Sequence, residues 1–344
     1  MAFTTINKSS LYQNTVLYTG NGSTQSITGV GFQPDFIWIK ARNDTRNHQL
    51  QDSVRNDFAD ILNSDSDGAQ GTFTDGVTAV GSDGFSVGAR AALNTTSDTL
   101  VSWNWKMGTT SGLSGGTITP SGYSISTTAG QSVIAYAGTG SAGTIPHGLG
   151  KTPDMIMVKE TSNATDWAVY HIKVGNAKFL KLNTDAAQAA TSNWNSTLPT
   201  SSLFSIGAGG QVNTSGRTYV AYCFANIPGY SKAGSYVGTG NADGVFVYTG
   251  FRPAMVIVKD TNNNEDWWMV DYKRSAYNLT DKIITPDQNI AEVQDTGYFG
   301  DMVSNGFKMK STNVSFNASG NYFTYLAFAE FPLVSSNDVP TVAR

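Results

Sequence analysis

The 344-residue chain is poor in the residues that most often carry chemistry, with one cysteine and three histidines. A single cysteine excludes a disulfide within the chain, and Cys223 lies in the apolar stretch YVAYCF, where we expect a small buried hydrophobe. His48, His147 and His171 are scattered, and neither CxxC nor HExxH occurs, so the spaced ligands of a zinc site are missing. We therefore expect no metal and no cofactor.

Charged residues are also scarce, at 14% of the chain, and the net charge is −4. Lysine and arginine occur singly rather than in runs, which predicts neither a nucleic acid nor an anionic membrane as a partner. No stretch reaches the roughly 18 apolar residues of a membrane helix, and the start MAFTTINKSS lacks the apolar core of a signal peptide. We expect a protein that is made in a cytoplasm and does not insert into membranes.

Glycine and aromatic residues, by contrast, are plentiful: there are 36 glycines, and aromatics make up 11% of the chain. This balance favours folded, turn-rich β structure over disorder. Stretches such as GTGNADG lack the lysine of a phosphate-binding loop and no helix pattern follows them, so they are predicted to be hairpin turns. The length predicts two or three domains.

One short pattern occurs three times, as GFQPDFIWIK at 31–40, GLGKTPDMIMVK at 148–159 and GFRPAMVIVK at 250–259. When the copies are aligned on their prolines, the first half of the repeat corresponds without gaps, and an aromatic strand closes each copy. The proline-to-aromatic length is 71 residues in the first two copies and four residues longer in the third. The equivalent sets are Lys40, Lys159 and Lys259; His48, Trp167 and Trp267; Asp52, His171 and Asp271; Phe85, Phe204 and Phe307; and Trp105, Phe224 and Phe328.

Self-similarity of this kind predicts three copies of one structural unit. We place the units at 15–107, 132–226 and 227–344, the last with a C-terminal tail. Residues 1–14 lie outside the repeat and are predicted to form an N-terminal docking arm. Residues 108–131 are rich in Gly, Ser and Thr, as linkers are.

Within each copy the hydrophobic period is two, so FIWIK, MIMVK and MVIVK are predicted strands that are apolar on both faces. Such a strand is either covered on both sides or lies between units. Turns of NG, DG and GG type and the lack of helical patterns predict an all-β fold of three tandem antiparallel β-sandwich units. At most a helical turn is expected at 52–63 or 179–190.

The lysine that closes each pattern has two interpretations. A lysine at the end of an apolar strand usually reaches water or blunts a sheet edge, and this is the interpretation that we favour. The alternative is an ion pair with the acidic residue twelve positions on, Asp52 or Asp271. That pairing fails in the middle copy, where His171 stands.

Candidate ligand contacts are few. Glycan cleavage needs a pair of carboxylates, but the acidic residues are spread thinly over predicted loops and no pair stands out, so no catalytic residue is predicted. The tryptophans Trp167, Trp267 and Trp268 could stack on a sugar ring and are the predicted partner or glycan contacts. Because Trp267 aligns with Trp167, a core or inter-sheet position is the alternative.

Several stretches resemble a repeat common in tailed bacteriophages, especially those of marine hosts. They are FTTINKSSLYQNTVLYTGNGSTQS, GFQPDFIWIKARN, YTGFRPAMVIVKDT and YLAFAEFPLVSSNDVPTVAR. Proteins with this repeat are generally treated as virion components: tail fibres, head fibres or decoration proteins. The resemblance covers almost the entire chain and brings no established catalytic residues. The middle copy departs most, since GLGKTPDM lacks the aromatic after glycine and YHIKV replaces the DSVR-like block.

The resemblance implies a non-enzymatic virion structural protein, displayed on a fibre or appendage and contributing to host attachment. A capsid decoration protein and a glycan-binding or glycan-cleaving module are the alternatives. The implied partners are other virion proteins, contacted through the N-terminal arm and the first unit, and a host surface glycan. A homo-oligomer is expected, with a trimer favoured as in fibres. The third unit, richest in aromatics that look exposed, is the expected partner-facing end.

Overall fold

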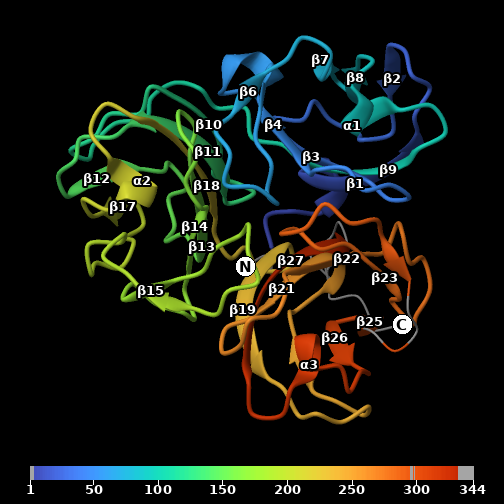
Figure 1. Ribbon diagram of the computed structural model, residues 1–344. Coiled ribbons are helices and arrows are strands. Elements are labelled where there is room, and N and C mark those ends of the chain that lie inside the picture. Colours follow the sequence, from blue (N-terminus) through green and yellow to red (C-terminus); the bar gives the residue numbers. More distant parts are fainter. Residues whose placement is uncertain (1–3, 295–296, 298, 332–344) are drawn as a thin grey trace.

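The computed structural model describes residues 4–294, 297 and 299–331, and it consists mainly of antiparallel β-sheets grouped into three lobes (Figure 1). The prediction of an all-β fold built from three antiparallel sandwich units is confirmed. Cys223 is fully buried, as expected from its apolar surroundings.

Each unit contains one large sheet in which the first and last strands of the unit pair with each other. The first has the order β1 (Gln13–Thr19), β9 (Thr99–Trp105), β3 (Phe36–Ala41), β4 (Gln49–Asp52). The second has the order β10 (Gly122–Ser126), β11 (Gln131–Ala137), β18 (Thr218–Phe224), β13 (Met155–Glu160), β14 (Ala168–His171). The third has the order β19 (Ser231–Val237), β27 (Tyr322–Phe331), β21 (Arg252–Asp260), β22 (Trp268–Asp271).

Smaller elements complete each unit on the side away from the centre (Figure 1). The second sheets are β2 (Gln25–Ile27), β8 (Gly84–Val87), β7 (Val77–Gly81); β12 (Gly143–Pro146), β17 (Leu203–Ile206); and β20 (Phe246–Tyr248), β26 (Gly306–Met309), β25 (Gly300–Val303). Short ribbons are β5 (Asp60–Ile61) with β6 (Gly71–Thr72), β15 (Lys178–Phe179) with β16 (Ala189–Ala190), and β23 (Lys282–Ile283) with β24 (Val293–Gln294). The helices are α1 (Ala91–Asn94), α2 (Gly210–Asn213) and α3 (Val314–Asn317), with 3₁₀ turns at η1 (Ser9–Leu11) and η2 (Asn56–Phe58).

The strands β3, β13 and β21 are buried on both faces, as their sequence pattern predicts. One set of alternate residues packs into the core of its own sandwich: Ile37 and Ile39, Ile156 and Val158, Val256 and Val258. The other set packs into a fourth core that all three units share: Phe36 and Trp38, Met155 and Met157, Met255 and Ile257. The large sheets therefore serve two cores each, and their inner faces meet at the centre of the molecule (Figure 1).

Three equivalent aromatic residues meet in this shared core. The ring centroids of Trp105, Phe224 and Phe328 lie 6.3, 5.8 and 5.8 Å apart, so each ring contacts the other two. Phe36 stacks on Trp105 at 4.8 Å and lies 4.5 Å from Tyr222 of the second unit. The three copies are thus related by a pseudo-threefold arrangement around these rings.

The N-terminal segment does not form a free arm. Ile6 is buried in the shared core, Ser9 is fully buried, and β1 begins at Gln13. The ring of Tyr12 packs edge-on against Tyr230, 6.1 Å away. The described part of the predicted docking arm, residues 4–14, is thus anchored in the body through Ile6, Ser9 and Gln13, and its role in docking stays a prediction. Residues 1–3 and the tail 332–344 lie outside the described residues.

The predicted linker is also partly structured. Within 108–131, β10 adds a fifth strand to the second large sheet by pairing with β11. The Ser124 hydroxyl donates to the carboxylate of Asp35 in the first unit at 2.8 Å. The composition indicated a linker over 108–131 but did not reveal that its last part forms a strand of the second large sheet.

Because the central rings serve all three units, loss of one should weaken the whole molecule. We expect Phe328→Ala to lower the free energy of unfolding by about 3–5 kcal/mol, as for large aromatic truncations in packed cores. Chemical denaturation followed by tryptophan fluorescence measures this.

Leu198→Ala, at a position 53% exposed in the second unit, is the control and should cost less than about 0.5 kcal/mol. A loss of similar size in both variants would contradict the role of the central contact.

Candidate functional site

The predicted glycan-contact tryptophans lie at the boundaries between units. Trp167 of the second unit donates its indole N–H to the carbonyl of Asn63 in the first unit, at 2.9 Å. Trp267 of the third unit donates in the same way to the carbonyl of Lys181 in the second, at 2.7 Å. Each indole therefore satisfies a main-chain carbonyl of its neighbouring unit.

His48, the equivalent residue of the first unit, closes the ring of contacts. Its Nδ1 accepts from the Trp38 indole at 2.8 Å, so Nε2 carries the hydrogen and donates to the carbonyl of Thr285 in the third unit, at 2.9 Å. Burial lowers the pKa of His48 to about 3, which keeps the ring neutral. The imidazole thus has a structural role at the third boundary.

We call these three boundaries seams and name them by the units they join. A main-chain hydrogen bond also crosses every seam at equivalent positions. The bonds are Gln70 N–H to Thr161 O at 3.0 Å, Gln188 N–H to Thr261 O at 3.1 Å, and Glu292 N–H to Arg42 O at 2.6 Å. The direction is always from one unit to the next, and the third unit returns to the first. The three units therefore form a closed ring rather than a row.

The repeated lysines are fully buried, so the prediction that they reach water was wrong. Lys159 donates to the carbonyl of Asp67 in the first unit at 3.1 Å, and Lys259 donates to that of Asp185 in the second at 3.0 Å. Lys40 stays within its own unit, where it bonds the carbonyls of Ala41 and Asp44 at 2.7 and 3.1 Å.

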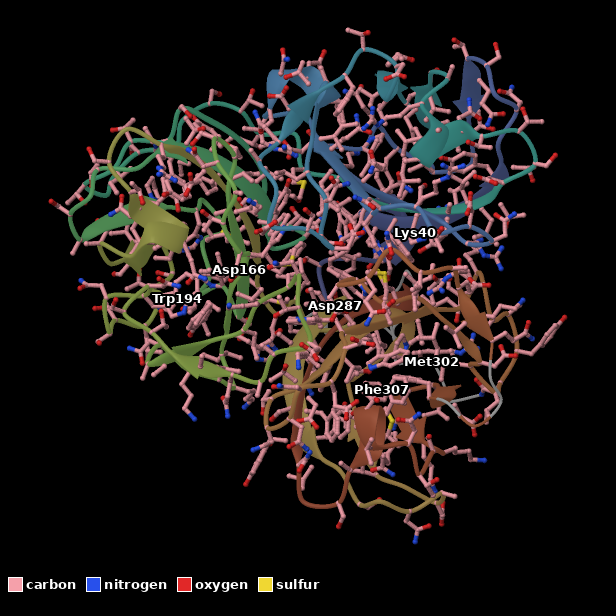
Figure 2. The ribbon with its side chains drawn as sticks, in the orientation of Figure 1. Lys40, Asp166, Trp194, Asp287, Met302 and Phe307 are labelled. Atoms are coloured by element: carbon pink, nitrogen blue, oxygen red, sulfur yellow. The ribbon has the colours of Figure 1, made fainter. Side chains whose placement is uncertain are left out.

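The strand ends are buried because the adjoining unit covers two of them. Burial lowers the pKa of each of the three lysines to about 8 (Figure 2 shows Lys40).

The alternative pairing of these lysines with Asp52 or Asp271 is not found either. Asp52 bonds the guanidinium of Arg55 at 2.7 Å and accepts from the hydroxyl of Tyr222 across the first–second seam, also at 2.7 Å. Tyr222 in turn accepts from Arg55 at 3.1 Å. The charges are thus buried as a hydrogen-bonded set, which offsets their desolvation.

The third–first seam repeats this arrangement with one more charge. Asp271 bonds Arg274 at 2.6 Å and accepts from the indole of Trp103 in the first unit at 3.0 Å. Glu292 bridges Arg274 and Arg42, at 3.2 and 2.8 Å. These two arginines hold the pKa of Glu292 below its usual range, although burial opposes the shift.

The second–third seam is uncharged at the same place. His171 donates through Nε2 to the main-chain carbonyl of Tyr325 at 3.2 Å, and Val174 occupies the position of the arginine. Burial lowers the pKa of His171 to about 4, so this ring is also neutral. The departure of the middle copy is therefore a change of seam chemistry.

The exposure of the three predicted contact residues argues against a role in sugar stacking. Trp167, Trp267 and Trp268 are 0%, 2% and 8% exposed. Trp268 packs 4.9 Å from Phe316, inside the third sandwich. A sugar cannot reach these ring faces without opening the core, so the inter-unit alternative describes Trp167 and Trp267.

Comparison with known proteins gives a family and no more. A family described as a domain of unknown function (DUF7483) matches residues 8–332. The chain belongs to the DUF7483 family. None of the curated proteins matched it.

Because the DUF7483 match spans all three units, the family corresponds to the closed three-lobed body rather than to the single repeat. Among residues 4–294, 297 and 299–331 no cluster of three or more His, Cys, Asp or Glu side chains could hold a metal. In the same part of the chain no helix is long and apolar enough to span a membrane.

The exposed aromatic side chains of the described residues all lie in the third unit. They are Phe246, Tyr248, Tyr277 and Tyr322, which are 45%, 54%, 87% and 58% exposed. Phe246 and Tyr248 line a groove beside the open edge of β19. Sequence reasoning singled out the third unit but not these residues, because they do not belong to the repeated pattern.

The seam hydrogen bonds should contribute measurably to stability. Trp267→Phe keeps an aromatic ring but leaves the partly buried carbonyl of Lys181 without its donor, which should cost about 1–3 kcal/mol. Trp105→Phe is the matched control, because the buried indole nitrogen of Trp105 has no partner among the described residues. Denaturant unfolding should show the larger loss for Trp267→Phe, and equal losses would contradict the seam interpretation.

Asp287 should make stability depend on pH. One oxygen of Asp287 accepts from the main-chain N–H of Trp267 at 3.0 Å. Burial, and after it the nearby Asp266, raises the pKa of Asp287 to about 8. A carboxyl whose folded-state pKa is raised stabilises the fold below about pH 4, and this contribution is lost as the pH rises towards 8. Asn183 occupies the equivalent position in the second unit, so an amide fits there.

Asp287→Asn should therefore stabilise the protein by roughly 1–3 kcal/mol at pH 8 and change little at pH 4. Asp65→Asn, at the equivalent position of the first unit, should give a smaller gain, because burial raises the pKa of Asp65 only to about 6. Thermal unfolding from pH 4 to 9 measures both variants. A gain for Asp287→Asn that is the same at every pH would show that ionisation is not its cause.

Proposed function

We propose that this DUF7483 protein is a non-enzymatic structural component of a bacteriophage virion, displayed on a fibre or related appendage. The sequence resemblance to repeats of tailed phages supports this proposal. The positions of the repeated residues support it as well. The equivalent lysines, ring residues and central aromatics lie in the shared core and the seams rather than in an open site.

The observation that carries the proposal furthest is the closed ring of seams. Every unit is joined to both neighbours by a main-chain hydrogen bond and by a buried ring that satisfies a neighbouring carbonyl. Separating one unit would expose the shared core and break two seams at once. A body that must keep its shape on the outside of a particle benefits from this arrangement, because no unit can open alone.

The pseudo-threefold arrangement also bears on partners. A docking site with threefold symmetry, such as the end of a trimeric fibre, could contact all three units of one chain in similar ways. A homotrimer is the oligomer that we propose, and the capsid decoration role is the alternative within the same proposal. Attachment would involve the folded surface of the first unit, since residues 4–14 are packed into the body.

Localisation on purified virions tests the proposal. A short epitope inserted after Leu198, in an exposed loop of the second unit, should leave the seams intact. Gold-labelled antibody should then decorate an appendage of the particle, and mass spectrometry should find the protein at a constant ratio to the major capsid protein. Labelling over the capsid surface would favour the decoration role, whereas abundance in infected cells with absence from purified virions would overturn the proposal.

A further inference from the structure

The third unit has a groove of about 550 Å³ that runs beside the edge strand β19. One wall is β20 of the same unit, and the other includes Ile172 and Lys173 of the second unit. In the second unit the equivalent edge, β11, is covered by β10. The groove therefore lies beside an edge strand that no further strand covers, and the first unit also leaves its equivalent strand, β1, at the edge of its sheet.

Two exposed aromatic rings on β20 form the wall of this groove, and both are specific to the third copy. Phe246 and Tyr248 flank Val247, which pairs with Phe307 of the repeated pattern. The pairing of Ile27 with Phe85 and of Ile145 with Phe204 identifies the equivalent positions. They hold Ser26 and Thr28 in the first unit, and Thr144 and Pro146 in the second.

A tyrosine hydroxyl also faces the groove. Tyr325 is only 3% exposed, lines the groove, and its hydroxyl makes no hydrogen bond within the described part of the chain. It reaches this place because Gly234 lies opposite it on β19, where a Cβ would come within 2.5 Å of the hydroxyl. In the other two units the edge strand carries the larger residue of the equivalent pair and its neighbour the smaller one. These pairs are Val16 with Ser102 and Ile134 with Ala221.

Two lysines give the groove a positive charge. Neither Lys173 nor Lys232 has an ion-pair partner among the described residues, and the two are close enough that Lys173 contributes to lowering the pKa of Lys232, after burial. The Lys232 ammonium donates to the carbonyl of Tyr248 at 2.7 Å and lies 5.1 Å from its ring. Asp154, the one carboxylate of the groove, accepts from the N–H of Asn226 at 2.8 Å. An anion between the lysines would relieve their repulsion.

The edge of β19 is poorly suited to a peptide strand. The side-chain amide of Asn226 already accepts from the N–H of Ala233 at 2.6 Å and donates to its carbonyl at 3.3 Å. Ser124 of β10 lies at the corresponding place on β11, opposite Val133. The amide thus blocks strand addition at the centre of the edge, while the aromatic wall and the tyrosine hydroxyl stay open.

We propose that this groove binds a segment of an acidic polysaccharide. The apolar faces of sugar rings would pack on Tyr248 and Phe246, while a sugar hydroxyl would hydrogen-bond with the Tyr325 hydroxyl. A carboxylate or sulfate on the sugar would lie between Lys173 and Lys232. The observation that carries this proposal is the linked departure of four positions, Gly234, Phe246, Tyr248 and Tyr325, from the other two copies. It concerns the isolated protein and does not depend on its place in a virion.

Calorimetric titration of the purified full chain tests the proposal with four probes of similar length: oligogalacturonate, a sulfated heparin oligosaccharide, a neutral dextran oligosaccharide and poly-glutamate. At least one acidic saccharide should bind, and binding should weaken as NaCl is raised from about 50 to 300 mM. Dextran and poly-glutamate should bind at least about tenfold more weakly. Equal binding of dextran would overturn the acidic character of the ligand, equal binding of poly-glutamate would overturn sugar recognition, and no binding by either acidic saccharide would overturn the proposal.

Variants of the groove locate the site. Tyr248→Ala and Lys232→Met should each weaken binding about tenfold, and Tyr325→Phe, which removes only the hydroxyl, about threefold to tenfold. Tyr277→Ala removes an aromatic that is 87% exposed but does not line the groove, and it should bind like the unaltered protein. Thermal unfolding of each variant checks that the fold is kept. If folded Tyr248→Ala and Tyr325→Phe bind as tightly as the unaltered chain, the saccharide binds elsewhere and the assignment is wrong.

Discussion

The contact among Trp105, Phe224 and Phe328 is the constraint on which the architecture depends. Side chains alternate along a strand, so an inner strand that is apolar on both faces must be covered twice. One face packs inside its own sandwich, and the other finds cover only where the inner sheets of all three units meet. The three rings at this meeting point come from equivalent strands, so each copy fills the centre with an aromatic residue at the same repeat position. A unit removed from the ring would expose the apolar face that packs into the shared core, and the family match covers all three units together.

The seams join the three units into a closed ring, and their side-chain chemistry differs from one seam to the next. Main-chain bonds and ring contacts recur at all three boundaries, whereas charges are used selectively. Asp–Arg pairs lie at the first–second and third–first seams, and neutral His171 lies at the second–third seam. A buried charge that loses its partner is strongly destabilising, so the charged seams strongly disfavour partial opening. The groove borders the neutral seam, where the main-chain carbonyl of Tyr325 is held by His171 while its hydroxyl faces the groove.

Much of the fold could be predicted from the sequence, because alternation and repeat spacing are local properties. The three sandwiches and the doubly apolar strands follow from residues such as those of FIWIK and MVIVK. Closure into a ring could not be predicted, since three copies at nearly equal spacing are also compatible with a linear array of independent units. The burial of Lys159 depends on a loop of another unit, and the pairing of Gly234 with Tyr325 depends on strand register. The sequence left two interpretations of Trp167 and Trp267 open for the same reason: an aromatic in a polar stretch looks exposed until the neighbouring unit that covers it is known.

The central claim is that the three units share one core and open together. Native-state hydrogen exchange with mass spectrometry, resolved to the strands β9, β18 and β27, tests it most directly. If the account is right, the amides of these strands exchange with one common free energy of opening, equal to that of global unfolding, and Phe328→Ala lowers the value in all three strands alike. If one strand exchanged at a distinctly lower free energy while the other two stayed protected, the units would be independent and the account of the fold would be contradicted.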